Sequence, residues 1–221
     1  MNLPVEDEYH CNKRHLALVT VIFLLIIIPT PVWCLNVTYI VLSHQLSYPQ
    51  FEIEQYLNKA ADTIHYYTGL NTEINIRIIL HPDSLSFNNH AFPSWSAAVY
   101  RKGEIHLRNP YLLLKKGIFK NILSHELFHA VVHQNGLFLP QWFEEGFAYF
   151  LFPTSIPKLN DKRYDADFFK LESLEFYNNS YIMVKKLMRE KSQKEIRDFF
   201  LFCQEVGFYS ALSQFSQVSA Y

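Results

Sequence analysis

The spacing of hydrophobic residues predicts four strands in the first half of the chain, and helices that make up most of the second half. Apolar and polar side chains alternate over residues 73–80 (EINIRIIL), which is the two-residue period of a strand with one buried face. Two shorter alternating stretches lie on either side of Lys102 and Gly103, a turn signal typical of a hairpin. Residues 81–94 are polar and bounded by prolines, so we expect a loop there. The predicted strands are residues 37–42, 73–80, 97–101 and 104–107.

The helical period of 3.6 residues is clearest over residues 112–134, which contain no proline and are predicted to form one helix. Asn135 and Gly136 follow, the usual chemistry of a helix C-terminus. Further helices are predicted at residues 51–67, around 142–148, and at 174–189, 194–205 and 209–215. This order predicts an α+β domain with a small mixed sheet and a C-terminal helical lobe.

The N-terminus carries an apolar, uncharged run at residues 16–28, preceded by Lys13 and Arg14. A membrane span needs about 20 residues, so the span would extend to about residue 35. One interpretation is an uncleaved single-pass anchor with residues 1–15 in the cytoplasm and residues 36–221 on the non-cytoplasmic side. The alternatives are a cleaved signal sequence, which would leave a secreted or periplasmic domain, and a buried core helix.

Composition narrows the classes of partner. The chain has 20 Lys and Arg residues against 21 Asp and Glu residues, a formal net charge of −1, so no basic field favours nucleic acid as a partner. Cys203 is the only cysteine after the N-terminal segment, which excludes a disulfide within residues 36–221. That length suffices for one domain with a sizeable core, and the oligomeric state is not indicated.

Residues 125–129 read HELFH, the HExxH pattern. On a helix, residues four apart lie on one face about 6 Å apart, so His125 and His129 can direct two ring nitrogens at one cation. Glu126 lies beside them, where it can take a proton from water. His133 is one turn further on, and a straight helix cannot bring it to the same ion as His125, about 12 Å away. The alternative is an amphipathic core helix with two hydrogen-bonded histidines.

A second motif follows at residues 142–148, which read WFEEGFA. HExxH followed by this segment resembles the gluzincin metallopeptidases; it is similar to the alanyl-aminopeptidase family and closer still to the peptidase MA-like group. In those families the Glu before the Gly is the third zinc ligand, which corresponds to Glu145. Glu144 is the rival, and a helical rotation of about 100° per residue would turn it away. The alternative is that neither glutamate binds a metal and that both belong to a solvent-exposed, acidic first turn of the helix.

Two further features of the sequence bear on the substrate: a weaker resemblance at residues 177–187, and the absence of a segment that binds an amino terminus. Residues 177–187 resemble an aminopeptidase segment whose tyrosine stabilises the oxyanion, which corresponds to Tyr177; a buried structural tyrosine is the alternative. The family's segment that binds a free amino terminus is missing. Residues 103–110 stand in its place and are predicted to form an edge strand to which an extended peptide could be added. Glu104 is the one acidic residue in this segment that could bind a substrate amine. The sequence does not indicate whether the activity would be that of an endopeptidase or an exopeptidase.

The resemblance implies a thermolysin-like zincin domain at residues 36–221. Zn²⁺ would be bound by His125, His129 and Glu145, with Glu126 as general base and a peptide or protein as substrate. We therefore expect a membrane-anchored or exported zinc metallopeptidase. Two alternatives use the same residues: a catalytically inactive zincin-fold binding or structural module at the membrane, and a zinc hydrolase of a non-peptide amide.

Overall fold

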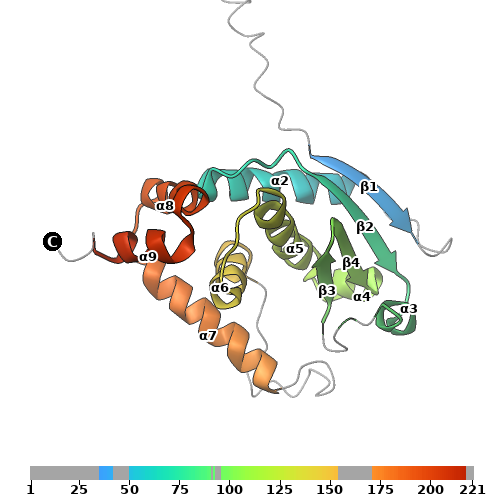
Figure 1. Ribbon diagram of the computed structural model, residues 1–221. Coiled ribbons are helices and arrows are strands. Elements are labelled where there is room, and N and C mark those ends of the chain that lie inside the picture. The colour runs from blue at the N-terminus through green and yellow to red at the C-terminus, as the bar shows by residue number, and fades with distance from the viewer. Residues whose placement is uncertain (1–34, 42–49, 91, 93–95, 154–170, 218–221) are drawn as a thin grey trace, which may run out of the picture. The chain divides into compact units, whose positions relative to one another are not determined.

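The computed structural model describes residues 35–41, 50–90, 92, 96–153 and 171–217. A four-stranded sheet and eight helices make up this part of the chain (Figure 1). The expectation of a mixed α+β fold with a small sheet is therefore confirmed. The apolar N-terminal segment, with its anchor and signal-sequence alternatives, lies outside the described residues. None of the described helices is both long and apolar enough to cross a membrane.

The sheet is mixed, with strand order β1-β2-β4-β3. Its strands are β1 Asn36–Val41, β2 Asn75–His81, β3 Ala98–Arg101 and β4 Glu104–Arg108. β1 pairs with β2 and β2 with β4 in parallel, whereas β3 and β4 pair antiparallel. The predicted hairpin is confirmed, and both of its turn residues, Lys102 (φ 51°) and Gly103 (φ 82°), adopt the left-handed conformation that such turns require.

The predicted edge strand at residues 103–110 is wrong. β4 lies between β2 and β3 and pairs with both, so no further strand can be added to it. β3 forms the outer edge instead. The hydrophobic pattern could not reveal this order, because the parallel pairing of β2 with β4 joins segments that are separated in sequence by β3.

One face of the sheet is packed against helix α2 (Gln50–Thr68) and the HExxH helix, α5 (Phe119–Gln134) (Figure 1). Side chains at alternate strand positions, such as Ile78 and Ile105, are fully buried on this face. α2 contributes Leu57 and Ile64 at helical spacing, also fully buried. Each such side chain contributes roughly 1.5–3 kcal/mol to folding. The sheet and α2 thus fix the position of the HExxH helix.

The predicted single helix over residues 112–134 is interrupted. Helix α4 (Pro110–Lys115) ends where Gly117 adopts φ 68°, and α5 begins at Phe119. The Gly117 N–H donates to the Leu114 carbonyl and the Ile118 N–H to the Leu113 carbonyl, a glycine-based helix end. Glycine in the left-handed conformation therefore terminates a segment whose apolar spacing alone suggested continuity.

The predicted loop at residues 81–94 contains a short helix, α3 (Ser84–Asn88). Asp83 caps it, because its carboxylate accepts a hydrogen bond from the Ser86 N–H at 2.8 Å. α3 contacts β2 and β4. Phe87 on this helix is fully buried, which explains why a polar segment is held against the sheet.

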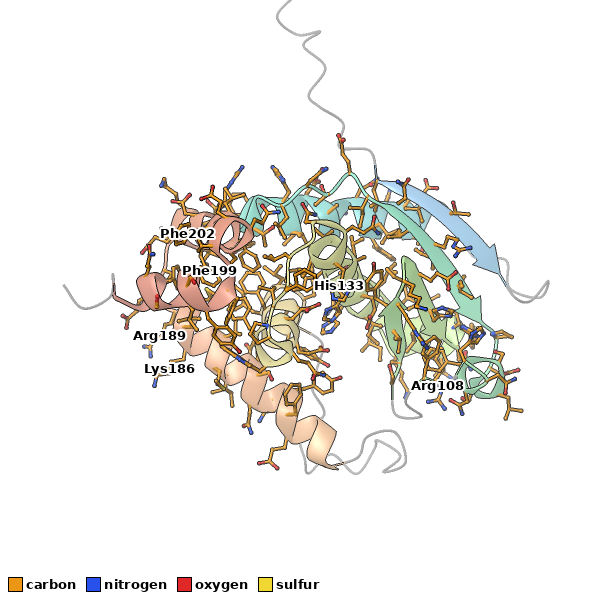
Figure 2. The ribbon with its side chains drawn as sticks, in the orientation of Figure 1. Arg108, His133, Lys186, Arg189, Phe199 and Phe202 are labelled. Carbon is orange, nitrogen blue, oxygen red and sulfur yellow. The ribbon has the colours of Figure 1, made fainter. Side chains whose placement is uncertain are left out.

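The predicted helical lobe is present in the C-terminal half of the described chain. It consists of α6 Gln141–Leu151, α7 Leu171–Met188, α8 Gln193–Val206 and α9 Phe208–Gln217. A cluster of aromatic rings fills the space between α5, α6, α8 and α9, and Phe199 of α8 lies within it (Figure 2). The other members are Phe128, Phe143, Phe147, Phe200 and Phe208. This cluster holds α6, which carries Glu145, against α5.

Candidate metal centre

The two histidines of the HExxH motif lie one turn apart on α5 and face the same point. Their Nε2 atoms are 3.1 Å apart, and their rings meet edge to face with centroids 4.9 Å apart. Both side chains are nearly enclosed, with 10% and 12% of their surface exposed. The helix brings together the two residues that the sequence predicted as a pair.

Glu145 on α6 completes the group. Its Oε2 lies 3.1 Å from Nε2 of His125 and 3.6 Å from Nε2 of His129. One ligand atom from each of the three residues lies within 4.8 Å of the others, so the group could hold a metal ion. Two imidazoles and one carboxylate, buried together, form a donor set that suits a divalent transition metal.

Glu144 points to the opposite side of His129. Its Oε1 accepts a hydrogen bond of 2.6 Å from Nδ1 of His129 and lies 3.2 Å from Nε2 of His133. Burial raises the pKa of Glu144, but the hydrogen bonds from the two histidines outweigh it and lower that pKa to about 2. A carboxylate on Nδ1 fixes the ring so that Nε2 keeps its lone pair for the ion. Glu144 is therefore positioned as the orienting partner that the sequence left unidentified.

His133 lies outside the group, as the helix geometry predicted. Its side chain is 54% exposed, and Figure 2 shows it on the open side of α5. Its ring meets that of Tyr100 on β3, with centroids 5.4 Å apart. Its Nε2 shares Glu144 with Nδ1 of His129.

Glu126 is held from the sheet side. Its Oε2 accepts a hydrogen bond of 2.7 Å from the backbone N–H of Tyr100. Burial raises the pKa of Glu126 above that of an ordinary glutamate, against the influence of His125 and His129. A carboxylate with a raised pKa, one residue away from the ligand group, suits a residue that takes and returns a proton.

Tyr177 of α7 lies beside the same site, next to the ring of Tyr149. Burial raises the pKa of its hydroxyl, and Glu145, Tyr149 and Glu126 raise it further, so the phenol stays protonated. A neutral phenol can donate a hydrogen bond. Its ring centroid lies 5.7 Å from that of Tyr149, which in turn is 4.7 Å from that of His125.

Tyr149 is a site residue whose role the sequence did not predict. It lies one helical turn after Glu145 on α6. Its ring covers His125 and contacts Tyr177, so it forms one wall of the group. The one-turn spacing after Glu145 was the available signal.

Gly146 explains how α7 approaches so closely. A Cβ built there would overlap the carbonyl oxygen of Ser180 and lie 2.7 Å from a methyl group of Val184. The glycine of the WFEEGFA segment therefore has a structural reason: only a residue without a side chain lets α6 and α7 pack so that Tyr177 reaches the site.

Glu104 does not face this group. Its carboxylate lies 3.1 Å from Nε2 of His106 and 2.5 Å from a nitrogen of Arg77. These partners lie on the face of the sheet opposite α5, because their strand positions alternate with those of the buried Ile78 and Ile105. The suggestion that Glu104 might bind a substrate amine at the HExxH site is therefore wrong.

The comparisons with known proteins add no assignment. No protein-family model matches the chain, and a search of curated proteins gives no match either.

Proposed function

We propose that this protein is a zinc-dependent metallopeptidase with a gluzincin site. His125, His129 and Glu145 would hold Zn²⁺, and Glu126 would serve as general base. The observation that carries the proposal is the convergence of these three ligand atoms within 4.8 Å, next to a buried carboxylate with a raised pKa. A structural metal site would have no need of that carboxylate.

The roles of the residues follow from their positions. A Zn²⁺ ion bound here supplies a Lewis acid that polarises a carbonyl and lowers the pKa of water. Glu126, oriented by the Tyr100 N–H, accepts the proton of the attacking water and passes it to the leaving amine. Tyr177 donates a hydrogen bond to the oxygen on which negative charge develops. Glu144 keeps His129 in the tautomer that binds a cation.

The finer fold assignment, a thermolysin-like zincin, belongs to the same proposal. It is supported by the antiparallel edge strand β3, which contacts α5, and by Glu145 on the next helix. Because β3 is an edge strand, an extended peptide substrate could pair with its backbone groups other than the Tyr100 N–H, which already donates to Glu126. We propose peptides or proteins as substrates on this ground.

The location of the domain is also a proposal. The apolar run at residues 16–28 with its preceding basic residues supports an anchor or signal sequence that places residues 36–221 outside the cytoplasm. The balanced charge of the chain gives no support for a nucleic-acid partner.

The test compares hydrolysis by the full chain and by Glu126→Gln. A mixture of unstructured peptides is incubated with each, and new termini are identified by mass spectrometry. We expect wild type to cleave peptide bonds in the presence of Zn²⁺ and to stop when a chelator removes it. Glu126→Gln should be slower by roughly 10²–10⁴-fold, because it lacks the base. Glu205→Gln, at an exposed position of α8, should cleave like wild type.

Three results would overturn the proposal. Full activity of Glu126→Gln would exclude the proposed mechanism. A metal-loaded wild type that cleaves no peptide would point to a binding or structural module. Cleavage of non-peptide amides alone would make the protein a zinc hydrolase of another class.

A further inference from the structure

A second group of histidines lies on the other face of the sheet. This second histidine cluster consists of His81 at the end of β2, His106 in the middle of β4, and His90, two residues after α3. His81 and His106 are buried, with 0% and 3% exposed, whereas His90 is exposed. None of the three belongs to the HExxH group, and β2 and β4 direct His81 and His106 away from α5.

The ring nitrogens of the cluster converge. Nε2 of His81 lies 2.9 Å from Nδ1 of His106, and one ligand atom from each of the three residues lies within 4.8 Å of the others. The His90 ring centroid is 5.0 Å from that of His81 and 5.1 Å from that of His106. In a tetrahedral site with bonds of about 2.0–2.1 Å, ligand nitrogens are about 3.3 Å apart. The buried pair would have to open by only a few tenths of an ångström.

His106 is oriented as metal-binding histidines are. Its Nε2 lies 3.1 Å from Glu104 Oε2, and the other oxygen of Glu104 is paired with Arg77. A carboxylate accepts the Nε2 proton and leaves the lone pair on Nδ1, the atom that faces His81. This is the same carboxylate–histidine arrangement that Glu144 and His129 form at the first site.

His81 is difficult to explain by packing alone. It is fully buried, and its Nδ1 has no hydrogen-bond partner of standard geometry among the described residues. A buried polar group in that state costs about 1–3 kcal/mol, which an apolar residue against Phe87 would avoid.

Among the described residues, the neighbours of the second histidine cluster include two aromatic rings. Phe87 and Phe92 line the cluster with apolar rings, at centroid distances of 5.3 Å from His81 and 4.6 Å from His106. His90 is the exposed member, so an ion could enter at its side and keep a water as fourth ligand. Two ligands come from the sheet and the third from the segment after α3.

We propose that His81, His90 and His106 form a second metal site for a borderline divalent cation such as Zn²⁺, which ties the segment carrying α3 to the sheet. Three imidazoles without a thiolate favour Zn²⁺, Cu²⁺ or Ni²⁺ over Mg²⁺ or Ca²⁺. The site is independent of the proposed peptidase activity, because it shares no ligand with the HExxH group.

The test isolates this site in the full chain carrying His129→Ala, which disables the first group. Co²⁺ serves as the spectroscopic probe, and Zn²⁺ competes with it. We expect one equivalent of Co²⁺ with the visible absorption of a tetrahedral site. Zn²⁺ should displace it and raise the melting temperature with concentration, as ligand linkage requires.

Adding His90→Ala should weaken binding by about a hundredfold or more, because loss of even an orienting partner costs 10–100-fold. His90 is exposed, so this change leaves the buried pair and the fold in place. The control Asn89→Ala, at the adjacent exposed position, should bind like its parent.

Absence of Co²⁺ binding in His129→Ala, or binding that is indifferent to His90→Ala, would overturn the second site. Failure of the HExxH group to bind a metal gives a different pattern. In that case wild type binds a single equivalent, which is lost with His90→Ala and kept with His129→Ala.

Discussion

The backbone N–H of Tyr100 donates a 2.7 Å hydrogen bond to the carboxylate of Glu126. This bond joins the edge strand β3 to the HExxH helix. Because the donor is used by Glu126, it is unavailable to a further strand at that position. The sheet thus orients the proposed base through the backbone N–H of Tyr100. Among substitutions at position 100, only proline removes this group.

Tyr100→Pro should lower the rate of hydrolysis and leave metal binding intact. Proline lacks the N–H, and an edge strand tolerates it where the N–H points away from its neighbour. A hydrogen bond to a charged group contributes about 1.5–3 kcal/mol, so we expect a loss of roughly tenfold to a hundredfold in kcat. Peptide cleavage and metal content are measured on the same preparation.

Tyr100→Ala is the matched control, since it removes the same ring and keeps the N–H. A rate equal to that of Tyr100→Pro would assign the effect to the ring, which lies near His133, and would contradict a role for the hydrogen bond.

Gly146→Ala should destabilise the fold. The new methyl group would overlap the backbone of Ser180 on α7, which cannot give way as a flexible side chain can. Overpacking of this kind costs about 1–3 kcal/mol. Urea denaturation of wild type and variant measures it, and Asn179→Ala, at an exposed position next to Ser180, should match wild type. Equal stability of Gly146→Ala would mean that α6 and α7 are less closely packed than described.

Cys203 should make stability depend on alkaline pH. Burial raises the pKa of its thiol from 9.0 to about 12, so between these values the unfolded thiol releases a proton that the folded one keeps. The contribution is fully present below about pH 9 and is lost as pH rises towards 12. From pH 8 to pH 10, wild type should lose about 1 kcal/mol more unfolding free energy than Cys203→Ala. Parallel losses in the two proteins would show that the thiol ionises freely in the folded state.

The hydrophobic pattern predicted the fold class and most elements, because periodicity reports which face of a segment is buried. It failed where a single residue ends or starts an element, and where the position of a strand depends on pairing with a segment distant in sequence. Gly117 ends α4 through its left-handed backbone, and Asp83 starts α3 through a side-chain cap. The position of β4 inside the sheet depends on pairing with β2, which no local pattern encodes.

The two histidine groups show the same contrast. His125 and His129 lie one helical turn apart, so local geometry brings them together. His81 and His106 come from separate strands and meet only through the parallel register of β2 and β4. Spacing in the sequence carries no sign of that meeting. The role of Glu144 was predicted in part. Helical rotation predicted that Glu144 points away from the direction of Glu145, but it did not predict the contact with His129.

The central claim is that His125, His129 and Glu145 bind a metal ion. A measurement of the metal content tests it most directly. The full chain, Glu145→Ala and Glu144→Ala are dialysed against buffered Zn²⁺ and analysed for bound zinc. Glu145→Ala should hold one equivalent fewer than wild type, because it lacks a ligand. Glu144→Ala should keep the full number with about 10–100-fold weaker affinity, because only the orientation of His129 is lost. Equal zinc in wild type and Glu145→Ala, or loss of an equivalent only in Glu144→Ala, would contradict the account.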